Sequence, residues 1–249
     1  MSALTERGVT WLAIAALYLA AQLAGDYLCL WAGTWPGRPG EWVAALRNSR
    51  YAHELGTAGE FIYLLGIPYI ALLTGVADAR ALGLVGLTWW PRALTGGAVG
   101  LGGVLLMAWS WRRVAAIHRQ RSGRRQVLRA EWQALRMPWG WVPLAAQVLC
   151  LQMSWAFVRG GAVKLLGLYT GVFVGLALLG IAWFLRPGRW ASLADPDSRA
   201  TDLVTASLAV ITSLVFLYSE NLWLCGLIHA LGLGLVLLVV STARTPGVA

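Results

Sequence analysis

The run LWLCGLIHALGLGLVLLVVS, residues 222–241, decides the fold of this chain. It has twenty residues and no Asp, Glu, Lys or Arg among them. A helix needs about 20 mostly apolar residues to cross the hydrocarbon core of a bilayer. The run therefore predicts a transmembrane helix, and it places His229 close to the middle of the membrane.

Similar apolar runs recur along the chain. With 58% hydrophobic and 12% charged residues over 249 positions, the composition differs from that of a soluble globular protein. We predict an all-α, polytopic transmembrane helical bundle of about seven spans, with six to eight as the range. The expected spans are about 9–32, 57–77, 93–111, 139–158, 165–185, 201–218 and 222–241. No repeat of 20–50 residues is visible, so residues 1–249 are interpreted as one integral membrane domain.

The net charge of +9 comes mostly from arginines between the apolar runs. Membrane topology explains that distribution, and no nucleic-acid-binding motif accompanies it. With seven spans, one side of the membrane carries fifteen basic residues (33–56, 112–138, 186–200 and the C-terminal segment) and the other side five. The positive-inside rule predicts that the richer side is cytoplasmic and the N-terminus outside. The high Ala, Gly and Arg content suggests a GC-rich bacterial genome, so we expect the bacterial inner (plasma) membrane.

Four further features follow from residue type. Residues 113–136 are predicted as a basic cytoplasmic loop or an amphipathic helix with an internal charge pair. The glycines of LTGGAVGLGG, residues 94–103, predict close packing of the third span against another helix. Cys29, Cys150 and Cys225 show no metal-binding spacing and are expected to be small buried hydrophobes. The tryptophans gather near span ends, which is typical of interfacial belts.

Charged or titratable side chains inside a membrane are costly and are candidates for function. The candidates are Asp26, Glu60, Arg159, Glu220 and His229. The three carboxylates lie near span ends, where their side chains can reach the interface. Arg159 ends the fourth span and is either an interfacial anchor or a functional group. His229 lies deepest, and from its position alone it is either a hydrogen-bonded core residue or a site residue.

Three stretches carry a resemblance to a known family. They are AVITSLVFLYSENLWLCGLIHALGLG (209–234), PLAAQVLCLQMSWAFVRGG (143–161) and DARALGLVGL (78–87). Together they resemble the CPBP family, the CAAX-protease and bacteriocin-processing intramembrane proteins. The resemblance covers roughly residues 60 to 235, and its most specific part is the closing motif around His229. It implies a CPBP-like helical bundle.

The resemblance also implies hydrolysis inside the membrane. In that family a glutamate activates water, and histidine and asparagine stabilise the oxyanion. Here Arg159 and Gly160 match the family's Arg-Gly, and His229 matches the closing histidine. The two glutamates fall on Ser154 and Trp155, neither of which can act as a carboxylate base. Leu185 stands at the second motif's histidine and Leu233 at the asparagine, so Arg159 and His229 are motif remnants without their usual partners.

One replacement for the lost base is available in EWQALR, residues 131–136. Glu131 and Arg136 have the separation that the family shows between its first glutamate and its arginine. Trp132 stands at the second position, and the segment is very basic. Glu60 and Glu220 are the other carboxylates that could approach His229 in space.

Three hypotheses follow. The leading one is a catalytically silent CPBP-like membrane protein that binds a membrane protein or a lipidated peptide within the bilayer. The alternative is an active, divergent intramembrane endopeptidase of the CAAX-processing type, with Glu131, Glu60 or Glu220 as the base. The second alternative is a structural or cofactor-binding subunit of a larger membrane complex, with His229, His53 or His118 as an axial ligand. We predict no cofactor and no metal, because a single histidine without a second ligand is poor support for a metal site.

Overall fold

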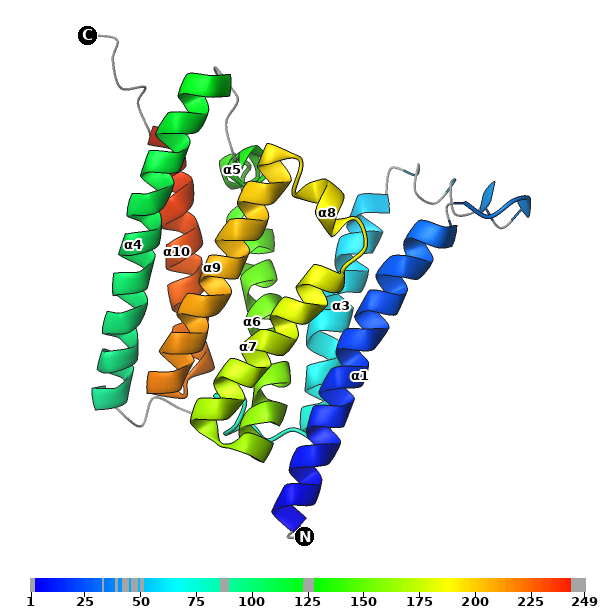
Figure 1. Cartoon of the computed structure of the whole chain (residues 1–249), viewed down its shortest axis with the longest axis vertical. Coiled ribbons are helices and arrows are strands. Elements are labelled where there is room, and N and C mark those ends of the chain that lie inside the picture. Colours follow the sequence, from blue (N-terminus) through cyan, green and yellow to red (C-terminus); the bar gives the residue numbers. More distant parts are fainter. Residues whose placement is uncertain are drawn as a thin grey trace. The chain divides into compact units, whose positions relative to one another are not determined.

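The structure is a computed structural model that describes residues 3–32, 34–38, 40, 41, 45, 49, 52–85, 90–122 and 128–242. Within these residues every regular element is a helix (Figure 1). The helices are α1 (Ala3–Ala32), α3 (Ala52–Leu73), α4 (Trp90–Ser122), α5 (Arg129–Arg136), α6 (Trp141–Leu166), α7 (Leu168–Leu185), α8 (Arg189–Ser192), α9 (Pro196–Ser219) and α10 (Leu222–Thr242).

Seven of the described helices are long and apolar enough to cross a membrane. Their candidate spans are Glu6–Ala32, Gly56–Leu73, Pro91–Ile117, Trp141–Leu166, Leu168–Leu185, Ser198–Ser219 and Leu222–Thr242. The predictions of an all-α chain and of seven spans are confirmed. The second span ends earlier than predicted, because a turn at Gly75 (φ +72°) follows α3.

The described residues of the basic segment 113–136 are mostly helical. Helix α4 continues through its first part to Ser122, and α5 forms its last part. Alanine, arginine and glutamine are good helix formers, which explains how α4 extends beyond its apolar run. In α5, Glu131 Oε1 accepts a hydrogen bond from Thr201 Oγ1 (2.8 Å) and the Arg136 guanidinium lies over the Trp132 ring, while the internal charge pair of this segment stays a prediction.

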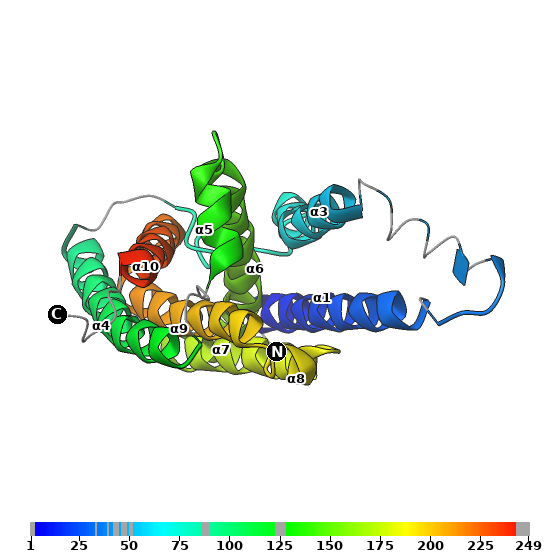
Figure 2. The ribbon, with the colours of Figure 1, turned by 90° about the horizontal axis from the view of Figure 1, so that it is seen from above.

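The helices group into two compact units, each discontinuous in sequence. Unit 1 contains residues 1–82 and 153–190, with α1, α3, α7 and the C-terminal part of α6. Unit 2 contains residues 83–152 and 191–249, with α4, α5, α9, α10 and the N-terminal part of α6. Within unit 2, helices α4, α9 and α10 pack side by side (Figure 2).

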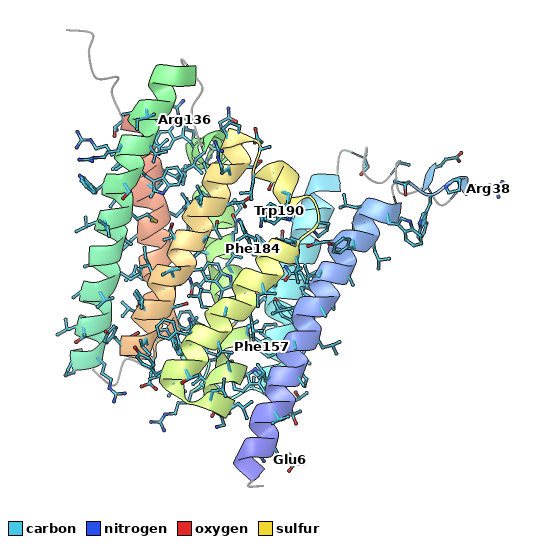
Figure 3. All side chains as sticks on the ribbon, viewed as in Figure 1. Glu6, Arg38, Arg136, Phe157, Phe184 and Trp190 are labelled. Carbon is cyan, nitrogen blue, oxygen red and sulfur yellow. The ribbon has the colours of Figure 1, made fainter. Side chains whose placement is uncertain are left out.

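An aromatic cluster forms the core of unit 1. Phe157 on α6, labelled in Figure 3, is fully buried, and its ring centroid lies 6.2 Å from that of Trp11 and 5.6 Å from that of Tyr18. Tyr18 stacks in turn on Tyr63 of α3 at 4.9 Å. Gly161 lets α6 approach α1, since a Cβ there would lie 3.1 Å from the Leu12 Cα. Aromatic contacts and small residues thus hold α1, α3 and α6 together.

Glycines give unit 2 its close packing. A Cβ on Gly100 would meet Val215 at 2.7 Å and Ile228 at 2.9 Å, and one on Gly103 would meet Ile211 at 3.1 Å. Helix α4 therefore lies directly against α9 and α10, and the close packing predicted from the glycine-rich third span is confirmed.

Helix α9 is capped at its start and is followed by a tight turn into α10. At its start, the Asp195 carboxylate accepts a hydrogen bond from the Ser198 N–H, and Pro196 is the first helical residue. The helix ends at Glu220, which has left-handed backbone (φ 50°). Asn221 Oδ1 then accepts a hydrogen bond from the Leu224 N–H (3.0 Å) and caps α10. Glu220 and Asn221 reverse the direction of the chain and set the position of α10. Because His229 lies on α10, they also set the position of its side chain.

Candidate functional site

His229 lies in the core of unit 2, where its side chain is 3% exposed. Three polar residues from other turns and helices surround it, and we call the four together the polar cluster. Its members are Gln152 on α6, Thr212 on α9, and Cys225 and His229 on α10. All four are buried. A buried polar group in a membrane needs internal hydrogen-bond partners, and the cluster supplies them.

The closest contact in the cluster joins the Gln152 amide to the imidazole. Gln152 Nε2 lies 2.8 Å from His229 Nδ1. An amide nitrogen can only donate, so Nδ1 accepts, which places the imidazole proton of a neutral His229 on Nε2. The partner at Nδ1 is therefore an amide and not a carboxylate. In this arrangement Gln152 orients the ring but cannot take a proton from it.

Thr212 extends the network toward α9. Its hydroxyl accepts a second hydrogen bond from Gln152 Nε2 (3.3 Å) and donates to the Leu208 carbonyl (2.8 Å). The Cys225 thiol donates to the Thr212 carbonyl (3.3 Å). Within the described part of the chain, Gln152 Oε1 has no hydrogen-bond partner. The cluster can therefore accept one further hydrogen bond at that oxygen.

Three other positions singled out from the sequence lie on the part of α6 that belongs to unit 1. Arg159 belongs to unit 1 and is 2% exposed; its Cα lies 2.7 Å from where a Cβ on Gly175 would be. Ser154, for which the resemblance predicted a glutamate position, is buried and accepts a hydrogen bond from Tyr18 Oη (2.8 Å). Trp155 is partly exposed. Gly175 thus lets α7 pack against the backbone of Arg159, while Ser154 serves the packing of α1.

The three carboxylates considered as replacement bases are engaged elsewhere. Glu131 lies in unit 2 and accepts from Thr201 (2.8 Å), and Glu220 pairs with Arg92 (2.7 Å) at the end of α9. Glu60 lies in unit 1 with its carboxylate 3.9 Å from Arg186 Nη2. Among the interactions described for unit 2, neither Glu131 nor Glu220 contacts His229. His53 and His118 lie outside the described side chains.

An ion cluster stands near one end of α7 in unit 1. Arg186 Nε lies 2.7 Å from Asp26 Oδ2 of α1, and Arg186 also approaches Glu60 of α3. Tyr27 donates a hydrogen bond to the Leu185 carbonyl (3.2 Å) beside it. Asp26 and Glu60 are both near span ends, and the arginine that faces them ties α7 to α1 and α3. These residues were expected to be exposed to the interface, and their side chains are about one third and one half exposed.

The sequence did not single out Gln152 and Thr212, because only charged and titratable residues were considered inside the spans. The sequence signal that could have identified them is an amide or a hydroxyl side chain in the middle of an apolar run. Cys150 and Cys225 are buried as expected, whereas Cys29 is exposed, so that prediction is wrong for Cys29. Among the described residues, no group of three or more His, Cys, Asp and Glu side chains could hold a metal ion.

The seven apolar helices define an integral membrane protein of the polytopic α-helical class. Comparison of the chain with protein-family models, with curated proteins and with solved structures gives no match.

Proposed function

We propose that this chain is a catalytically silent integral membrane protein with a CPBP-like helical framework, and that it binds a membrane protein or a lipidated peptide. One observation carries the proposal: the buried His229 is held by the Gln152 amide at 2.8 Å, and an amide, unlike a carboxylate, cannot act as a general base. At Nδ1 the imidazole therefore meets an amide, which cannot accept a proton and activate water. A binding role uses other groups and survives the loss of the base.

The engagement of the remaining groups also supports a silent site. Ser154 is bonded to Tyr18, and Glu131 is bonded to Thr201. Each contact gives the residue a packing role within its own unit. In this proposal the basic segment 112–138 lies on the cytoplasmic side of a bacterial inner membrane.

The experiment is affinity purification of the full chain from native membranes in mild detergent, with intact-mass analysis of the co-purifying species. Parallel strains carry His229→Ala, Glu131→Gln, Glu60→Gln or Glu220→Gln. We expect a stoichiometric partner that keeps one intact mass in every strain. Arg80→Gln, which changes an exposed side chain, serves as the control for expression.

Two outcomes would overturn the proposal. A partner that is trimmed in the wild-type strain and full length with His229→Ala or one Glu→Gln change would establish an endopeptidase. Visible absorbance of the purified chain above the aromatic band, lost with His229→Ala, would establish a cofactor-binding subunit.

A further inference from the structure

One end of unit 2 combines arginines with exposed apolar side chains, and we call it the basic end. Its described arginines are Arg112 and Arg113 of α4 and Arg136 of α5, all exposed. Shortly after Arg136 in the chain, Met137 is 64% and Trp139 74% exposed. Over residues 112–138 the sequence has eight arginines against one acidic residue, Glu131. This segment is the most strongly charged part of the chain.

The basic end lies at the level where the membrane spans of unit 2 finish. The candidate span of α4 ends at Ile117, so that Arg112 and Arg113 lie in its last two turns, and α10 ends at Thr242. Helix α5 packs against α10, and its Glu131 is bonded to Thr201 in the first turns of α9 (Figure 1). Figure 3 shows Arg136 at this end of the unit. A position at the span ends is the depth of lipid headgroups.

Two of the arginines are stacked on indole rings. The Arg113 guanidinium carbon lies 4.3 Å from the Trp109 ring centroid, and that of Arg136 lies 5.4 Å from the Trp132 ring centroid. A guanidinium held by its face on an aromatic ring keeps its N–H edge available for a planar, bidentate acceptor such as a phosphate. Among the described residues, Arg112, Arg113 and Arg136 form no ion pair with a carboxylate.

We propose that the basic end binds the headgroups of anionic phospholipids in the leaflet around it. The guanidinium edges of Arg112, Arg113 and Arg136 contact the lipid phosphates, while Met137 and Trp139 lie among the upper acyl chains. Positive charge meets negative charge at the same depth, which fits an anionic lipid better than a zwitterionic one. Glu131, the single carboxylate of segment 112–138, accepts a hydrogen bond from Thr201 and, within the described part of the chain, forms no ion pair with these three arginines.

The test is a lipid titration of the delipidated full chain in detergent, followed by native mass spectrometry. Phosphatidylglycerol is compared with phosphatidylcholine of the same acyl chains. We expect the Kd for phosphatidylglycerol to be at least about fivefold lower, and Arg112→Gln/Arg113→Gln to reduce that preference by about fivefold or more. Arg112→Lys/Arg113→Lys keeps the charge and loses the bidentate edge, so it should keep more of the preference than the Gln pair does, which separates lost charge from lost folding.

The matched control is Arg7→Gln/Arg80→Gln, which removes the same charge from two exposed positions of unit 1. It should leave the preference unchanged. Equal affinity for the two lipids, or an equal loss in the control, would overturn the proposal. Complete displacement of phosphatidylglycerol by millimolar inorganic phosphate would also overturn it, since the surface would then be a site for free phosphate.

Discussion

Gln152 and His229, which are 77 positions apart in sequence, meet at 2.8 Å in the core of unit 2. This hydrogen bond joins α6 to α10 inside the apolar part of the unit. Its contribution is measurable, because removing one partner leaves the other buried and unsatisfied.

Gln152→Leu should lower the free energy of unfolding by about 1–3 kcal/mol, since His229 and Thr212 both lose a donor. In a double-mutant cycle with His229→Leu, we expect a coupling energy of about 1 kcal/mol, within the range for hydrogen bonds between membrane helices. Unfolding in mixed detergent micelles measures the free energy of unfolding of the wild-type chain, the two single variants and the double variant. Gln147→Leu, on the exposed side of the same helix, is the control. Strict additivity of the two substitutions would show that the bond contributes nothing.

Gly83 and Gly75 provide a matched pair of glycines with positive φ (+78° and +72°). At Gly83 a Cβ would lie 2.7 Å from Phe216 Cε2 and 2.9 Å from the Leu222 nitrogen, whereas nothing lies within 4 Å at Gly75. Gly75→Ala should cost about 1 kcal/mol from backbone strain alone, and Gly83→Ala about 2 kcal/mol or more. Thermal unfolding in detergent measures the difference. Similar losses of stability would mean that the α9–α10 turn tolerates the extra methyl group.

The lowered pKa of Asp78 should make the free energy of unfolding depend on pH. Partial burial raises the pKa of its carboxyl, but the hydrogen bond from the Arg80 backbone N–H and the Lys164 ammonium at 3.2 Å outweigh burial and hold the pKa below 3.8. The folded state therefore binds the proton more weakly than the unfolded state. The contribution is present above the unfolded pKa and is lost as the pH falls through the folded pKa.

Because both side chains are partly exposed, solvent screening keeps the contribution of the pair below about 1 kcal/mol. The Tm difference between the wild-type chain and Asp78→Asn should be constant from pH 7 to about pH 5 and should shrink below about pH 4. A difference that stays the same down to pH 3 would assign the effect to packing instead of charge.

Arg186 should matter more than other arginines near span ends. Arg186→Gln leaves Asp26 and Glu60 facing each other without their cation, so we expect a loss of about 1 kcal/mol in unfolding free energy. Asp26→Asn should restore part of that loss in the double variant. Arg80→Gln is the control for charge removal at an exposed position. If the double variant is less stable than Arg186→Gln, the pairing explanation is contradicted.

The sequence predicted the fold well where one physical requirement was sufficient. A bilayer demands about 20 apolar residues per helix, and that requirement identified seven spans without any contact information. Glycine spacing in the third span predicted close packing for the same reason, because small residues are what allow two helices to approach.

The candidate site was harder to predict. His229 stood out because it can ionise, but its partner Gln152 is uncharged and lies in a different motif of the chain. Pairing of residues 77 positions apart depends on how α6, α9 and α10 pack, which no local pattern contains. Glu131 had a suitable spacing to Arg136, yet Thr201 engages it, and spacing along one segment cannot reveal a contact to another helix.

Helix α6 contributes Gln152 to unit 2 and continues as unit 1 from Met153. During synthesis, unit 1 lacks its core residue Phe157 until α6 has been made, although α1 and α3 enter the membrane first. Unit 2 stays incomplete until its last helix, α10, is made. Each unit is built from two separate segments of the chain, so no single cut yields either unit whole. The helices made first therefore have to stay in the membrane without their packing partners until the later helices have been made.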